Sequence, residues 1–184
     1  MAKSKLKEAL EKYMSGTAGL RVGILENATY PDGLHVAQVA YWQEFGASVE
    51  VEAKKGVIHR KVDKHGNLIN GGRFVKASKA NLVTEHDIPA HTINIPPRPF
   101  FRNTISEGKK TWPQVLSDAI ADSGDEKKAL SILGEVIKDE LSNAVLSWET
   151  PHNALSTWAK KGFNKPLIDT GQMAKSFSYE VTDD

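Results

Sequence analysis

The chain has 184 residues, of which 40% are hydrophobic and 26% are charged, with 24 Lys and Arg against 23 Asp and Glu. The net charge of +1 excludes a protein that binds nucleic acid through its overall charge. The absence of cysteine excludes disulfides, thiolate metal sites and cysteine nucleophiles. The length favours a single domain over residues 1–184.

Leu6, Leu10 and Tyr13 have helical spacing and predict a peripheral N-terminal helix within residues 1–16. This segment is charged and amphipathic, unlike a secretory signal. No stretch approaches the roughly 20 apolar residues of a membrane span. We therefore expect the protein to be made and used in the cytosol, or inside a particle assembled there.

Alternation over residues 20–26 predicts a strand, and the apolar run 34–45 predicts a short helix that ends at Gly46. Short alternating pieces then predict one or two hairpins with a tip near residues 66–72. We interpret residues 47–92 as a surface insertion.

Residues 54–80 carry eight positive charges against one negative charge, that of Asp63. Two interpretations stay open: contact with DNA phosphates or an acidic partner, and a solvated hairpin whose lysines protect its edges from mispairing. Phe74 is the one aromatic residue there, so base stacking is not supported. The candidate contact residues are Lys54, Lys55, Arg60, Lys61, Lys64, Arg73 and Lys76.

A strand is expected at about 91–95, followed by a proline elbow at 96–100 that opens a long helical region. Thr111 and Gln114 have capping-box spacing and predict a break and restart there. The clearest helix is 125–148, where Leu130, Leu133, Ile137, Leu141, Ala144 and Trp148 form an apolar stripe. Between residues 114 and 149, eight acidic side chains oppose three lysines.

Residues after Pro151 predict a loop, then a short turn capped by Thr170, and a final strand at 175–182. The fold class is α+β. We expect one small, mainly antiparallel sheet made of 20–26, strands of the insertion, about 91–95 and 175–182. It packs against the helices at 34–45 and about 100–148.

Asp169-Thr170-Gly171 follows two apolar residues, as in aspartic proteases, which need two such aspartates sharing a proton. Only residues 172–184 follow, too few for the flap and supporting sheet. A capped turn is the favoured interpretation, and the protease is kept as an alternative.

The histidines are the other candidate for catalysis. His59, His65, His86 and His91 lie in extended or loop segments without ligand spacing, and no phosphate loop or nucleophile elbow is present. We expect no catalytic residue, metal or cofactor, with a histidine-dependent nuclease as a further alternative. Among the aromatic residues, Trp158 lies in a polar segment and is the best candidate for an interface anchor.

Three ordered pieces of the chain resemble the tail-completion and virion-morphogenesis proteins, the neck-associated family of tailed phages. They are Tyr41-Trp42-Gln43-Glu44-Phe45-Gly46, Ile95-Pro96-Pro97-Arg98-Pro99-Phe100-Phe101-Arg102, and Pro166-Leu167-Ile168-Asp169-Thr170-Gly171-Gln172-Met173 followed by Ser176. The resemblance covers residues 20–46 and 93–180. The insertion is longer and more basic than is typical of that family.

The resemblance implies a non-enzymatic virion protein that completes or joins the tail at the head-proximal end. It implies a homo-oligomeric ring around the DNA channel, with connector, terminator and tube proteins as neighbours and no membrane partner. The alternatives are a tail-terminator ring subunit and a DNA-binding module. The residues expected at interfaces are Arg98, Phe100, Arg102, Trp158, Asp169, Thr170 and Gln172.

A ring needs heterologous contacts, in which one patch meets a different patch on the neighbouring copy. The basic insertion and the acidic helical face are candidates for such a pair. This charge pairing is a hypothesis of the sequence.

Overall fold

The computed structural model describes residues 18–25 and 28–183, and it has the α+β fold that the sequence predicts. The helix expected within 1–16 lies outside the described residues. The chain divides into two compact units. We call the residues up to Ala47 and from Ile95 onward the body, and Ser48–Asn94 the ribbon, which covers nearly the same residues as the insertion expected at 47–92.

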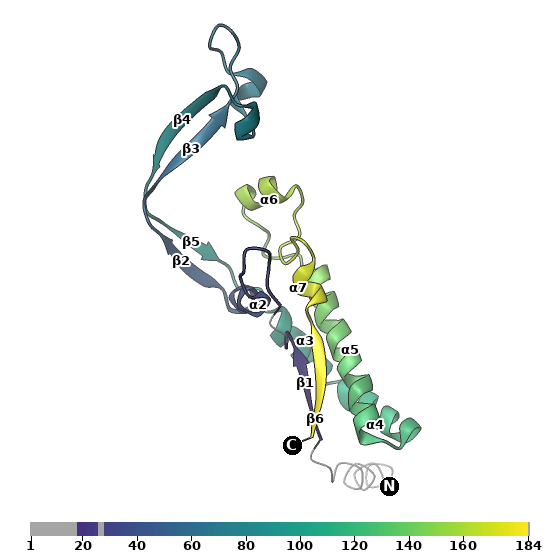
Figure 1. Cartoon of the computed structure of the whole chain (residues 1–184). Helices are drawn as coiled ribbons and strands as arrows, with labels where there is room; N and C mark the ends of the chain where they lie inside the picture. Colours follow the sequence, from purple (N-terminus) through teal and green to yellow (C-terminus); the bar gives the residue numbers. More distant parts are fainter. Residues whose placement is uncertain (1–17, 26–27, 184) are drawn as a thin grey trace. The chain divides into compact units, whose positions relative to one another are not determined.

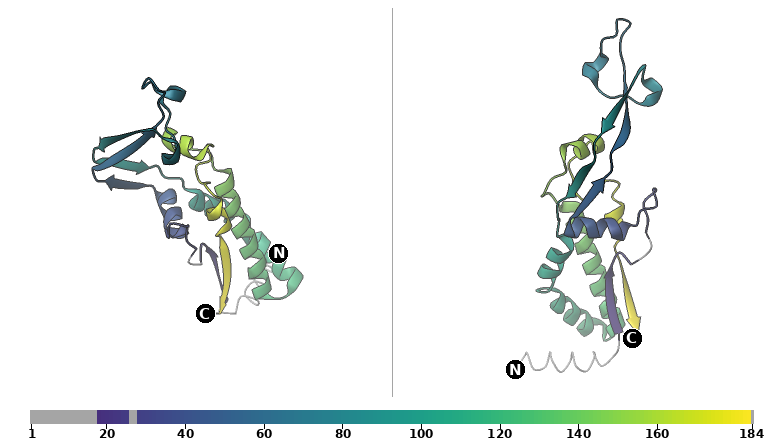
Figure 2. Two further views of the ribbon diagram at one scale, coloured as in Figure 1. Left: turned by 45° about the horizontal axis from the view of Figure 1, so that its top comes forward. Right: turned by 90° about the vertical axis from the view of Figure 1, so that its left-hand side faces the viewer.

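The body is built on one long helix and one pair of strands. β1 (Ala18–Gly23) pairs antiparallel with β6 (Ser178–Asp183), and α5 (Glu126–Ser147) lies along both strands (Figures 1 and 2). Asp125 caps α5 by accepting the backbone N–H of Lys128 at 3.2 Å. The approach is close at Gly134, where a Cβ atom would lie 2.5 Å from the Tyr179 ring.

The apolar stripe of α5 supplies much of the body's core. Leu133, Ile137 and Leu141 are buried at the predicted spacing, and Val145 completes the row where Ala144 was expected. Burial of such side chains stabilises the fold by roughly 1.5–3 kcal/mol each. The other buried members of this cluster are Val36, Ala40, Phe100, Leu167, Met173, Ala174 and Phe177.

Shorter helices surround this core. They are α2 (Val36–Phe45), α3 (Phe100–Gly108), α4 (Trp112–Ser123), α6 (Leu155–Lys161) and α7 (Gln172–Lys175). The helix expected at 34–45 is confirmed, and Gly46 ends it at a positive φ of 79°. None of the described helices is both long and apolar enough to cross a bilayer.

Two local predictions in these helices are wrong. The break and restart predicted at Thr111 is confirmed, since α3 ends at Gly108 and α4 begins at Trp112 with Thr111 as its N-cap, but the capping box does not form. The Thr111 hydroxyl donates to the Gly108 carbonyl at 3.4 Å, and the Gln114 side chain donates to Asp118 at 2.7 Å. The loop expected after Pro151 contains α6. Gly162 closes this helix, and its N–H donates to the Trp158 carbonyl.

The ribbon consists of two successive two-stranded ladders. β2 (Ala47–Val51) pairs with β5 (His91–Ile95), and β3 (Lys54–Arg60) pairs with β4 (Leu82–Ile88) (Figure 1). Its strands pair with one another and do not join β1 and β6, so the single sheet predicted from the sequence is wrong. Nested pairing within one hairpin closes short loops first and leaves the body strands to pair with each other.

Candidate functional site

The segments Tyr41–Gly46 and Ile95–Arg102, which are far apart in sequence, are tied together in the body. Glu44 accepts the backbone N–H groups of Phe101 at 2.8 Å and Arg102 at 3.2 Å, which are unpaired donors at the start of α3. Its carboxylate also accepts Arg102 Nε at 2.7 Å. Glu44 is only 4% exposed, so it is a structural cap for α3.

Arg98 extends this network inward. Its guanidinium donates to the carbonyls of Pro151 at 3.1 Å and His152 at 3.4 Å, and to the side-chain oxygen of Gln43. Its backbone N–H donates to the Gln43 carbonyl at 2.6 Å. Arg98 is 4% exposed, and burial lowers its pKa. The prediction that Arg98 projects toward a neighbouring subunit is wrong, because its guanidinium is buried and donates hydrogen bonds to oxygens of its own chain.

Phe100 is likewise a core residue and not an interface residue. It is 1% exposed and packs edge-on against Phe177, with ring centroids 6.3 Å apart. Phe100 is the first residue of α3, directly after the proline elbow, and its side chain is buried in the core of the body. Phe100 is large and apolar, and in the sequence alone those properties fit a core residue and an interface residue equally well.

Arg102 does reach the surface. Its side chain is 55% exposed, and its guanidinium stacks 4.8 Å from the centroid of Phe45, which in turn lies 4.8 Å from the Tyr41 ring. These residues border an apolar groove of about 450 Å³ whose wall includes Leu25. This patch is a candidate contact surface of the body.

The Asp169-Thr170-Gly171 turn connects the end of the chain to the segment before α2. Gln172 donates from Nε2 to the Thr29 carbonyl at 2.6 Å, and Thr170 Oγ1 accepts the Gln172 N–H at 3.4 Å. The N-cap position of α7 is Gly171, at a φ of 77°, one residue after the predicted Thr170, but the Thr170 hydroxyl makes the predicted contact with a free backbone N–H at the start of the helix. Asp169 and Thr170 are exposed and remain accessible to a partner.

Two groups near this turn have shifted pKa values. Burial raises the pKa of Tyr30, and the negative charges of Asp169 and Asp32 raise it further. Burial lowers the pKa of Lys161, whose Nζ donates to the Lys165 carbonyl at 2.7 Å. The turn is therefore a packed structural junction with one exposed carboxylate.

Trp158 lies on α6 and is 46% exposed. Leu155, one helical turn earlier, is also exposed, so the two side chains present an apolar patch at three-residue spacing. The sequence identified Trp158 as a candidate anchor but missed Leu155, because α6 itself was missed. Leu155 and Trp158 are two apolar residues at helical spacing, and this is the signal in the sequence that could have identified the patch.

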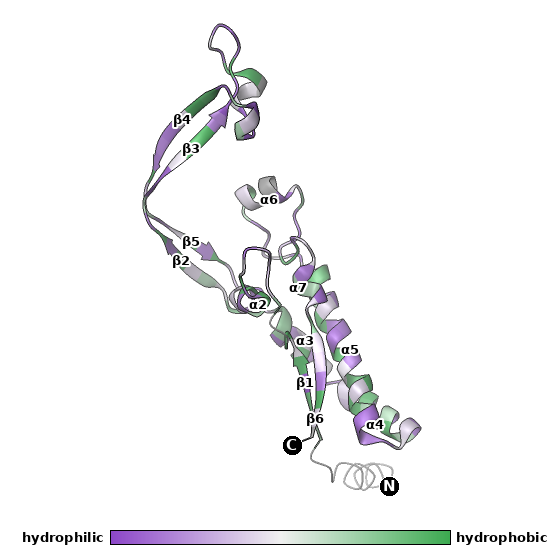
Figure 3. Ribbon diagram, in the orientation of Figure 1, coloured by the Kyte–Doolittle hydropathy of each residue, from purple (hydrophilic) through white to green (hydrophobic). Residues whose placement is uncertain are grey.

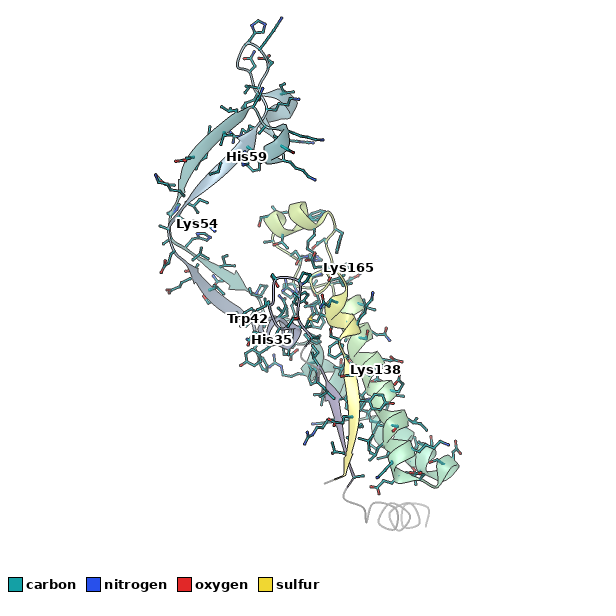
Figure 4. The ribbon with its side chains drawn as sticks, in the orientation of Figure 1. His35, Trp42, Lys54, His59, Lys138 and Lys165 are labelled. Atoms are coloured by element: carbon teal, nitrogen blue, oxygen red, sulfur yellow. The ribbon has the colours of Figure 1, made fainter. Side chains whose placement is uncertain are left out.

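The cations of the ribbon fall into two groups. Lys54 and Lys55 begin β3 (Figure 4), where the register places Lys55 opposite Asp87 and Val57 opposite Glu85. The acidic residues of β4 thus offset the positive charge at that end. The remaining cations lie at the tip of the ribbon, from the last residue of β3 to the start of β4: Arg60, Lys61, Lys64, Arg73, Lys76 and Lys79.

A second hollow lies in the body between α3 and α5, with a volume of about 740 Å³. Its acidic lining residues are Glu107, Glu140 and Glu149, and no Lys, Arg or His is among the residues that line it. Glu140 accepts the indole N–H of Trp112 at 2.8 Å. We call this hollow the acidic cleft. The sequence placed Glu140 and Glu149 on an acidic face but missed Glu107.

The histidines do not gather. His59 (Figure 4) and His86 lie on neighbouring strands of the ribbon, and His86 bonds to Thr84 Oγ1 at 2.8 Å. Within the described residues, no three His, Asp or Glu side chains form a group able to hold a metal ion. Comparisons with protein-family models, with curated proteins and with solved structures found no match to this chain.

Proposed function

We propose that this chain is a structural subunit of a tailed bacteriophage that completes or joins the tail at the head-proximal end by packing into a ring. The observation that carries the proposal is the ribbon. Each ladder of the ribbon is a pair of strands, and two-stranded pairs are marginally stable alone in water. A ribbon of this length is suited to contact with a partner.

The composition of the ribbon supports this role. Val57 and Val83 are 53% and 57% exposed, and Figure 3 colours parts of β3 and β4 as hydrophobic. Val49 and Ile93 are exposed on the other ladder. Apolar side chains left open on paired strands mark surfaces that a second molecule covers.

The contacts between the pieces that carry the resemblance support the proposal of a subunit that acts through its surfaces. Two of the three pieces meet at Glu44–Arg102 and Gln43–Arg98. The third piece is joined to the segment before α2 by the hydrogen bond from Gln172 to the Thr29 carbonyl. Residues that are far apart in the sequence therefore contact one another in the body. A subunit that acts through its surfaces needs such contacts to hold those surfaces in place.

The test is to inactivate the gene in the phage that encodes the chain and to image the particles by electron microscopy. The proposal predicts full heads separate from tails of normal length, with infectivity restored by the intact chain supplied in trans. Overlong tails would favour a tail-terminator ring instead. Normal infectious virions would contradict both.

A further inference from the structure

The ribbon tip carries an aromatic side chain surrounded by cations. Phe74 is 70% exposed, and the guanidinium of Arg60 lies 5.6 Å from its ring centroid. Arg73 and Lys76 are exposed on either side of it. Aromatic residues and arginine are the side chains that most often dominate binding energy at protein interfaces.

The tip holds these groups in a fixed arrangement. Asn81 clamps Val62 by two hydrogen bonds, one to each backbone polar group, at 2.7 and 2.8 Å. The N–H of Val75, next to Phe74, donates to the His59 carbonyl at 3.0 Å. A preordered anchor loses little conformational entropy on binding.

The acidic cleft has the complementary chemistry. Its lining includes the apolar side chains of Ala144 and Trp148 together with the acidic Glu107 and Glu149. A cleft of about 740 Å³ is large enough for an aromatic side chain with flanking cations. Glu149 is 74% exposed at its side chain, and its nearest described cation is Lys165 (Figure 4), with Nζ 3.8 Å from Oε1.

We infer that the ribbon tip of one copy docks into the acidic cleft of a second copy, with Phe74 against Ala144 and Trp148 and with Arg73 and Lys76 facing Glu107 and Glu149. This inference rests on the proposed function for its ring context. The two surfaces differ and lie on the same chain, so their contact is heterologous and propagates from copy to copy. Opposite charge also speeds encounter and fixes the register.

Duplex DNA is the competing partner for the tip, and the chain's features favour protein. Glu85 and Asp87 offset the positive charge near Lys55, so only the tip offers cations to the phosphates of a duplex. Phe74 is a lone aromatic, whereas the acidic cleft offers a cavity for it. DNA binding is therefore an outcome of the test.

The test uses two charge-reversed full-length variants, Arg73→Glu/Lys76→Glu and Glu107→Lys/Glu149→Lys. Self-association is measured by sedimentation at low and high salt, with circular dichroism as the check on folding. Each variant alone should associate at least tenfold more weakly than the parent chain, and an equimolar mixture should recover within about threefold. The matched control is Lys109→Glu/Lys110→Glu, two exposed cations that flank the cleft lining. It reverses the same number of charges but makes the surroundings of the cleft more negative, so it should not weaken association.

Recovery works because, in an alternating ring, each reversed tip meets a reversed cleft and each native tip meets a native cleft. Phe74→Ala should weaken association without changing the fold. A mixture that stays dissociated, or a parent chain that is monomeric up to about 1 mM, overturns the inference. Loss of salt-dependent duplex binding in the tip variant, with association unchanged, assigns the tip to DNA. Separate heads and tails in the gene-inactivated phage would still support the proposed joining function in that case. The contact between tip and cleft can therefore fail while the proposed function holds.

Discussion

Glu44 and Arg102 fix the end of α2 against the start of α3: the Glu44 carboxylate accepts Arg102 Nε at 2.7 Å while capping the first free N–H groups of α3. Arg102 also donates from its second terminal nitrogen to the Glu44 carbonyl at 3.2 Å. One buried acid thus sets the direction in which the helical region leaves the elbow.

Replacing Glu44 tests this cap. Glu44→Ala should lower the free energy of unfolding by about 2 kcal/mol, because a helix cap and a charge-assisted hydrogen bond are lost together. Arg102→Ala should cost less than about 1 kcal/mol, since that side chain is 55% exposed. Urea denaturation of both variants measures the difference, and equal losses would contradict the assignment of Glu44 as the cap.

Arg98 provides a second test of the elbow. Arg98→Met retains the apolar stem but leaves the Pro151 and His152 carbonyls and the Gln43 side chain without their donor. Unpaired buried acceptors should lower the free energy of unfolding by about 3 kcal/mol. Arg102→Met is the matched control, with a smaller loss. Unchanged stability of Arg98→Met in urea would show that the network is dispensable.

Gly134 tests how closely α5 packs on the two strands. In an exposed helix, Gly→Ala stabilises by about 1 kcal/mol. At this position the new Cβ would lie 2.5 Å from the Tyr179 ring and 3.0 Å from Leu20 Cδ1, so Gly134→Ala should instead destabilise by about 1–3 kcal/mol. Thermal unfolding gives the sign, and a raised melting temperature would contradict this packing. Asn143→Ala, on the exposed side of the same helix, should not be destabilising.

Asp63 tests the organisation of the ribbon tip through pH. Backbone N–H groups of Asn67 and His65 stabilise its carboxylate, and these hydrogen bonds hold its pKa below the ordinary value of 3.8. A lowered folded-state pKa means that the contribution to stability is present above pH 3.8 and is lost as the pH falls through the folded value. The protection of the His65 and Asn67 amides from hydrogen exchange, taken relative to the intrinsic exchange rate at each pH, should therefore fall only in strong acid.

The variant Asp63→Ala should show that faster exchange already at neutral pH. The body amides serve as the internal reference, since the loop lies in a separate compact unit. Exchange at residues 65 and 67 that matches the unmodified chain would mean that other contacts order the tip.

Hydrophobic periodicity predicted much of the body. Leu133, Ile137 and Leu141 recur at helical spacing, and the α5 they define differs from the prediction of 125–148 by one residue at each end. Alternation likewise located β1 and β6. Local pattern is informative in these segments because each element buries one face against the same core.

The nesting of the ribbon could not be read from the same signals. β2 and β3 alternate as strands should, but alternation does not name a partner, and β5 was assigned to the central sheet. The charge pattern misled for the same reason: Glu85 and Asp87 follow the basic segment in sequence, yet the pairing brings Asp87 opposite Lys55. The positive charge is thereby confined to the tip.

The elbow residues show a different limit. Arg98 and Arg102 are the same residue type four positions apart, and one is buried while the other stacks on Phe45 at the surface. The choice depends on where the Pro151–His152 segment returns, which is a long-range feature. Glu44 is an acidic residue in an otherwise largely apolar helix. It was the sign in the sequence that this side of α2 packs against another part of the chain.

We propose that this chain forms a ring in the phage neck, and a cryo-electron microscopy reconstruction of the intact virion tests that proposal most directly. The prediction is a ring of copies of this chain between head and tail, in which the ribbon of each copy contacts its neighbour. Purified infectious virions that lack the chain, or that hold it away from the head–tail junction, would contradict the account.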